Sequence, residues 1–160
     1  MTTTAPIPPI TGTVTVGLPV EQAFRVFTAS FDTWWPHEYH IGQSEVAEVI
    51  PEPRGGGRWF ERGVDGTERD WGRVLAWEPP HRLLFTWQIN GMMTFDPDPA
   101  HASEIEARFI PDGSEQSIVE VKHRHFDRLI GGEAVRTMIQ GGGGWVQLLD
   151  GYTKTVANQP

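Results

Sequence analysis

Two ionisable side chains stand where an apolar strand face is expected, and they are the residues best suited to chemistry. Glu61 lies two residues after Trp59 in one expected strand, and His123 lies two residues after Val121 in another, so each is expected on the same face as that apolar residue. A carboxylate and an imidazole on one face could act as general acid and base, or could orient the polar end of a ligand. The same pattern also fits a structural ion pair and a core histidine.

Two arginines are also expected on the apolar face. Arg69 and Arg73 each lie two residues from Trp71, and residues two apart in a strand point to the same side of the sheet. A charge on an apolar face needs a partner of opposite sign. We therefore expect Glu61 and Arg73 to form a structural ion pair, buried or half-buried, across neighbouring strands. If the site is instead catalytic, the pKa of His123 should lie near neutrality.

Aromatic side chains dominate the composition, which has seven tryptophans and no cysteine. They recur at alternating strand positions and near the C-terminus, so their rings could share one inner face. Such a face is either a solid aromatic core or the lining of an apolar small-molecule cavity. Together with the polar candidates, the predicted ligand-binding residues are Trp34, Trp35, Trp59, Glu61, Trp71, Arg73, Phe85, Trp87, Phe109, His123, Met138, Trp145 and Leu149.

Histidines also occur in two pairs whose spacing is compatible with metal binding. His37 and His40 lie three residues apart after Pro36, and His123 and His125 share one face of an expected strand. A zinc site needs three or four convergent ligands, and no third ligand lies near in sequence. We therefore predict no metal site and no cofactor, and we place His37 and His40 in a solvated loop near the mouth of the cavity.

These residues must be positioned by an α+β arrangement of one antiparallel sheet and a few helices. A helical pattern follows Pro19, a short helical turn follows that, and a C-terminal helix over residues 131–157 is interrupted by glycines at 141–144. The helices must cover the apolar face of the sheet, because the other face reads as solvated. We expect a disordered tail at 1–9 and a single domain at 10–160, with strands at 10–17, 45–50, 57–62, 67–77, 82–89, 103–110 and 116–126.

Charge and hydropathy exclude several classes of partner. A formal net charge of -8 at pH 7 argues against nucleic-acid binding, which needs a basic surface, and against binding to an anionic membrane. No apolar run approaches the ~20 residues of a membrane span, and no signal peptide is recognisable. We expect a cytoplasmic protein, and the sequence does not distinguish a monomer from a homodimer.

Several local motifs, in this order, carry a resemblance to a known superfamily. They include Trp34-Trp35-Pro36 at the end of the second, short helix, Gly56-Gly57-Arg58-Trp59-Phe60-Glu61, Trp71-Gly72-Arg73-Val74-Leu75-Ala76-Trp77-Glu78-Pro79-Pro80, Leu83-Leu84-Phe85-Thr86-Trp87 and Gly144-Trp145-Val146-Gln147-Leu148-Leu149. Over roughly residues 10–157 the chain resembles the START-like (SRPBCC) superfamily. Within it, the chain is similar to bacterial homologues of the C-terminal domain of Aha-type activators of a heat-shock ATPase.

The resemblance implies a helix-grip fold, in which a curved antiparallel sheet of six to seven strands wraps on a long C-terminal helix and two short helices follow the first strand. It implies no single function, because this scaffold carries lipid transfer, hormone binding, polyketide cyclisation and chaperone activation. Binding of a small hydrophobic or aromatic ligand between sheet and helix is the function we expect. A cyclase- or hydrolase-like enzyme with Glu61 or His123 as acid and base is the alternative, and a co-chaperone-like interaction module is a further one.

Overall fold

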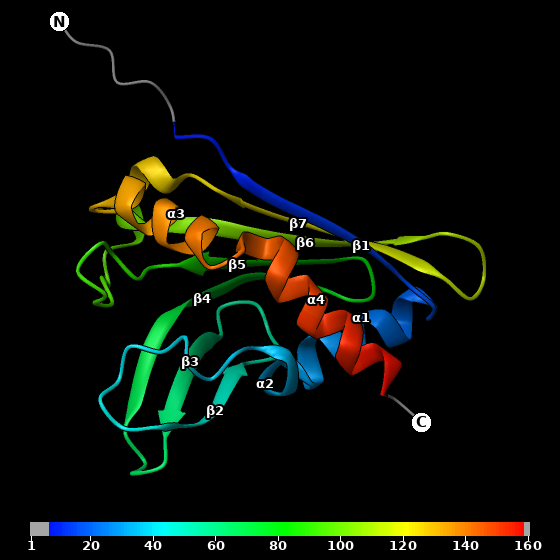
Figure 1. Cartoon of the computed structure of the whole chain (residues 1–160), viewed down its shortest axis with the longest axis horizontal. Helices are drawn as coiled ribbons and strands as arrows, with labels where there is room; N and C mark the ends of the chain where they lie inside the picture. Colours follow the sequence, from blue (N-terminus) through cyan, green and yellow to red (C-terminus); the bar gives the residue numbers. More distant parts are fainter. Residues whose placement is uncertain (1–6, 159–160) are drawn as a thin grey trace, which may run out of the picture.

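A seven-stranded antiparallel sheet, curled around helices on one face, forms the framework of the protein (Figure 1). The computed structural model describes residues 7–158. The predicted α+β helix-grip fold is confirmed. The elements are β1 (Ile10–Val16), α1 (Val20–Ala29), α2 (Phe31–Trp34), β2 (Val46–Pro51), β3 (Arg58–Gly63), β4 (Glu68–Glu78), β5 (Arg82–Trp87), η1 (Pro99–His101), β6 (Ser103–Pro111), β7 (Ser117–Arg124), η2 (Phe126–Arg128), α3 (Gly132–Gly141) and α4 (Gly144–Ala157).

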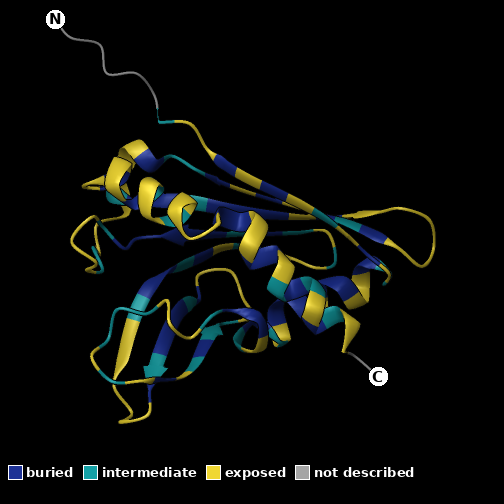
Figure 2. Ribbon diagram, viewed as in Figure 1, coloured by how far each residue is buried: buried dark blue, intermediate teal, exposed yellow. Residues whose placement is uncertain are grey.

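The strand order β1-β7-β6-β5-β4-β3-β2 follows from the alternation that the sequence displays. Strands β2 to β7 pair with their neighbours in the chain, and β1 joins the free edge of β7, where Ile10 lies opposite His123. Inward residues are mostly apolar and buried, while many outward residues are exposed (Figure 2). Burial of this face against the helices is the main stabilising term of the fold.

One irregularity in the sheet changes which side chains face inward. Between β3 and β4 the register shifts, so that Trp59 pairs with Gly72 but Phe60 pairs with Asp70. Trp71 is therefore the extra residue of a β-bulge, and its side chain is buried. Because of the bulge, Arg73 does not share the inner face with Trp71.

The glycine run that interrupts the C-terminal helical pattern separates two helices, α3 and α4, instead of lying inside one long helix. Gly143 and Gly144 both have positive φ, at 102° and 64°, a conformation that glycine adopts at little cost. Helix α4 then crosses the concave side of the sheet (Figure 1) and packs on β1. The approach is close at Gly12, where an added Cβ would lie 3.2 Å from the backbone carbonyl carbon of Trp145.

The beginning of the chain was predicted to be a tail, and residues 1–6 of that tail lie outside the described residues. Ile7 is half-buried and packs against the core. The carbonyl of Pro8 accepts a hydrogen bond from Arg136 Nε at 2.7 Å. Within residues 7–158, no helix is long and apolar enough to cross a bilayer.

The outer face of the sheet carries a buried carboxylate, Glu106, surrounded by arginines. Arg82 Nε lies 2.7 Å from one of its oxygens, while Arg108 Nε and Arg124 Nη1 lie 3.1 and 3.4 Å from the other. Burial by itself raises the pKa of Glu106, but the hydrogen bonds from Arg108 and Arg82 and the charge of Arg124 outweigh it and lower the pKa to about 2.

Replacing this carboxylate by an amide should therefore weaken the fold in a pH-dependent way. We expect Glu106→Gln to lower the free energy of unfolding at pH 7 by about 1–2 kcal/mol. A carboxyl group with a lowered folded-state pKa stabilises the fold above its unfolded-state pKa, and this contribution disappears as the pH falls toward about 2. Urea unfolding at pH 7 and at lower pH measures the difference. Glu115→Gln, at an exposed turn, is the control, and equal stabilities of Glu106→Gln and the parent at pH 7 would contradict the prediction.

Candidate functional site

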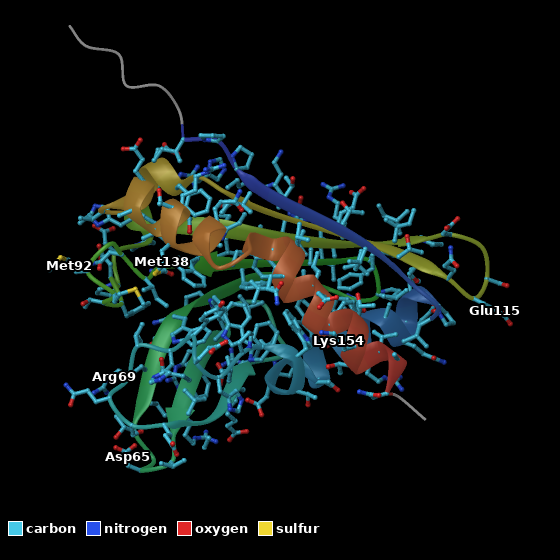
Figure 3. All side chains as sticks on the ribbon, in the orientation of Figure 1. Asp65, Arg69, Met92, Glu115, Met138 and Lys154 are labelled. Atoms are coloured by element: carbon cyan, nitrogen blue, oxygen red, sulfur yellow. The ribbon has the colours of Figure 1, made fainter. Side chains whose placement is uncertain are left out.

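A cavity of about 320 Å³ lies between the concave face of the sheet, the segment that follows α2, and helices α3 and α4. Its lining is mainly apolar. Met138 borders the cavity. In Figure 3 it lies at the same end of the molecule as the exposed Met92. The lining residues are Trp35, Glu38, Tyr39, His40, Ile41, Trp71, Trp87, Ile89, Met93, His123, Met138, Ile139, Gly142, Gly144, Trp145 and Leu148.

Four tryptophans form the aromatic wall of this cavity, and Trp35 lies among the other three. Its ring centroid is 5.5 Å from that of Trp71, 6.1 Å from that of Trp145 and 6.4 Å from that of Trp87. The planes in these pairs are inclined at 46° to 60°, so the rings meet at angles and do not stack flat. The four indoles are buried and give one side of the cavity an aromatic, apolar surface.

His123 lies at the base of the cavity, and both of its ring nitrogens are engaged. Trp145 Nε1 donates to Nδ1 at 3.4 Å, and Nε2 lies 3.0 Å from the hydroxyl of Ser103, which in turn donates to the carbonyl of Trp87. An indole nitrogen can only donate, so Nδ1 is the acceptor and Nε2 carries the proton. Burial lowers the pKa of His123 to about 3. His123 therefore lacks the pKa near neutrality that an acid–base role would require, and it is a neutral core histidine.

Glu61 is buried and holds the segment after α2 in place. Its oxygen Oε1 accepts hydrogen bonds from Ile41 N at 2.6 Å and from Trp71 Nε1 at 2.9 Å, and Oε2 accepts one from Gly42 N at 3.1 Å. The predicted ion pair with Arg73 is thus wrong. Backbone and indole N–H groups satisfy the carboxylate, which lies beneath the cavity wall rather than in it.

Arg73 lies away from the cavity, because the bulge at Trp71 turns its side chain outward. Its guanidinium is 3.2 Å from Asp70 Oδ2 and 5.5 Å from the centre of the Phe95 ring. Arg69, which was expected on the same inner face, is exposed.

The cavity therefore brings together six of the predicted site residues and leaves out seven. Those that line it are Trp35, Trp71, Trp87, His123, Met138 and Trp145. Five of the others are buried in the core around it, with Trp34 Nε1 bonded to the Phe27 carbonyl and Trp59 Nε1 bonded to that of Thr86. These five are Trp34, Trp59, Phe85, Phe109 and Leu149, and the remaining two are Glu61 and Arg73.

Residues 38–41 of the segment after α2 line the cavity mouth, although sequence reasoning named none of them as ligand-binding. The Trp35 indole donates to the Tyr39 carbonyl at 3.3 Å, and Glu61 binds the next two backbone N–H groups along the chain, those of Ile41 and Gly42. The segment has no periodic pattern, so the only available signal was its position directly after the Trp-Trp-Pro motif.

The two histidine pairs do not come together as metal ligands. His37 Nε2 lies 2.7 Å from Asp32 Oδ1 at the surface. Strand β7 ends at Arg124, and His125 has a φ of 66° and a half-buried side chain near Glu104, so the expected shared face of His123 and His125 is wrong. Within residues 7–158, no group of three or more His, Cys, Asp or Glu side chains could hold a metal ion.

Several solved structures match nearly the whole chain. The anthrahydroquino-gamma-pyrone synthase Txn09, complexed with SUM, is 38% identical, with a TM-score of 0.65 over 94% of this chain and 97% of that one. The self-sacrificing resistance protein CalC from Micromonospora echinospora is 29% identical, with a TM-score of 0.67 over 93% and 94%. Protein NE0264 from Nitrosomonas europaea shares the fold at 15% identity, with a TM-score of 0.66 over 98% and 100%. A comparison with curated proteins finds no match.

The family described as Activator of Hsp90 ATPase homolog 1-like protein matches residues 17–157, which is most of the chain and includes every residue that lines the cavity. This match agrees with the curled sheet, the two helices after β1 and the C-terminal helix across the concave face. The chain therefore belongs to the Activator of Hsp90 ATPase homolog 1-like family, within the START-like superfamily.

Proposed function

We propose that this protein binds a small hydrophobic or aromatic molecule in the cavity between the sheet and helices α3 and α4. The observation that carries the proposal is the cavity of about 320 Å³ with four tryptophans in its lining. Small-molecule sites are typically concave, mostly apolar and of roughly 300–1,000 Å³, with a few polar groups that orient the ligand. Apolar area buried by the ligand would contribute about 25 cal/mol per Å² before the costs of association.

A side chain that fills the cavity mouth should block binding. Ile139 is half-buried in α3 and lines the cavity, so we expect Ile139→Trp to weaken the binding of naphthalene at least about tenfold, which corresponds to roughly 1.4 kcal/mol. The measurement is quenching of tryptophan fluorescence on titration with naphthalene, confirmed by calorimetry.

The matched control is Val146→Trp, because Val146 is 67% exposed on α4 and does not line the cavity. This control should bind naphthalene as the parent does. Absence of naphthalene binding to the parent would contradict the proposed function. Equal binding by both variants would show that the hydrocarbon sits elsewhere.

A ring-closing enzyme is the second candidate, and the 38% identity to a pyrone synthase over 94% of the chain supports it. In such an enzyme the same cavity would fold the substrate so that its reacting groups meet, an effect of proximity and orientation. His123 would line the cavity and would not act as a general base, because both of its ring nitrogens are already hydrogen-bonded within the protein.

The two candidates differ in what happens to a bound precursor. Incubating the protein with the precursor of the pyrone that names the synthase, and following the products by mass spectrometry, tests the second one. Pyrone formed faster than in a sample without protein supports catalysis. Stoichiometric binding with the precursor recovered unchanged supports binding alone.

A further inference from the structure

His40, in the segment after α2, has a polar atom whose bonding is incomplete. Within residues 7–158, its Nδ1 is the one buried side-chain nitrogen or oxygen that has no hydrogen-bond partner. The ring lines the cavity, and 27% of the side chain is exposed. A buried polar atom without a hydrogen-bond partner is costly, and attraction to a nearby charge of opposite sign can offset part of this cost.

The nearest charged group to this nitrogen is the Glu61 carboxylate, with Oε2 3.8 Å from His40 Nδ1. This separation is too long for a hydrogen bond, but a negative charge there favours the tautomer whose proton lies on Nδ1. Glu61 cannot turn away, since Ile41, Gly42 and Trp71 donate to it. The same bonds fix the backbone directly after His40.

With the proton on Nδ1, the other nitrogen of the ring, Nε2, has a free lone pair and can only accept a hydrogen bond. The other imidazole of the cavity, His123, has nothing to offer a ligand because both of its nitrogens are engaged. Glu38 and Tyr39 also border the cavity, but both are exposed and therefore hydrated. His40 is thus the partly sheltered polar contact for a ligand among the four tryptophans.

We propose that the molecule bound here is an aromatic compound with a ring hydroxyl, and that His40 Nε2 accepts the hydrogen bond from this hydroxyl while Glu61 sets the tautomer. The proposal rests on the proposed function, because it concerns the same cavity. It deepens that function by naming both the polar group of the ligand and the residue that selects it. A hydroxyl is favoured over a carbonyl, since Nε2 in this tautomer can only accept.

The test compares naphthalene with 2-naphthol, which differ only in the hydroxyl. Calorimetric titrations would be made on the parent, on His40→Phe, which keeps a ring and removes both nitrogens, and on His37→Phe. His37 lies outside the cavity lining, against Asp32, so it is the matched control. In His40→Phe the preference for 2-naphthol over naphthalene should fall about fivefold, the usual worth of one net hydrogen bond. It should be unchanged in His37→Phe.

Failure of this inference differs from failure of the proposed function. If the parent binds neither compound, the proposed function fails. If naphthalene binds but the preference for 2-naphthol is absent, or survives in His40→Phe, the hydroxyl inference is overturned and the cavity remains a binding site. Nitrogen-15 NMR of the parent is independent of any variant's folding. A proton on Nδ1 alone supports the inference, and a proton on Nε2 overturns it.

Discussion

Glu61→Leu should lower the free energy of unfolding by about 3–5 kcal/mol, although leucine is close to glutamate in size. The carboxylate is 1% exposed, and Ile41 N, Gly42 N and Trp71 Nε1 would all lose their acceptor. Each unsatisfied buried donor costs roughly 1–3 kcal/mol, partly relieved where water reaches the loop. Urea unfolding followed by tryptophan fluorescence gives the magnitude.

The same variant should also bind naphthalene more weakly, because Glu61 fixes the segment that forms the cavity mouth. Glu45→Leu is the control, since Glu45 lies in the same segment and is exposed; it should change stability by less than about 0.5 kcal/mol. Glu61→Gln should fall between the two, because its one remaining oxygen can still accept. A loss of under 1 kcal/mol in Glu61→Leu would show that the three N–H groups do not depend on this carboxylate.

Gly72→Ala should be the most damaging small substitution in the sheet, with a loss of about 4 kcal/mol or more. A Cβ at this position would clash with the Thr86 carbonyl oxygen and lie 2.5 Å from Trp59 Nε1, two atoms that are hydrogen-bonded to each other. Both are held by the sheet, so the backbone of β4 would have to move. Thermal and urea unfolding of the purified variant, or its failure to accumulate in soluble form, measures the effect.

The control is Gly17→Ala, where an added Cβ would meet nothing within 4 Å. Removal of glycine's flexibility in the unfolded chain should leave that variant as stable as the parent or slightly more stable. A Gly72→Ala protein with the parent's unfolding midpoint would mean that β4 and β5 can separate freely at this point. It would also weaken the assignment of Trp59 to a fixed core position.

The fold was largely predictable because its signals are local. Alternation with a period of two marks seven strands, and the structure confirms the ends of each within two residues; β5 ends at Trp87, and Ile89 beyond it forms an isolated bridge to Phe95. Pro19 and the apolar spacing after it predicted α1, whose buried residues include Ala23 and Phe27. Even the glycines at 141–144 marked a break in the last helix, although not that helices would form on both sides.

The site was only partly predictable, because its lining depends on contacts between distant segments. Trp71 and Arg73 are two residues apart, a spacing that predicts that both side chains lie on the same face of the sheet. The bulge in β4 opposite β3 places them on different faces instead. A bulge is a mismatch between two strands and has no signature in one of them. Likewise, Trp59 and Trp71 alternate in the same way, yet only Trp71 borders the cavity.

The sequence by itself determined the sheet, the helices that cover it and the aromatic character of the space between them, because strand and helix periodicity are properties of consecutive residues. Only the tertiary structure decided which rings pack solidly and which border a cavity, since a cavity is the volume that packing leaves unfilled. It also decided the partners of the two candidate groups. Glu61 is satisfied by backbone N–H groups of a loop 20 residues earlier in the chain, and His123 by an indole 22 residues later, contacts that no local pattern encodes.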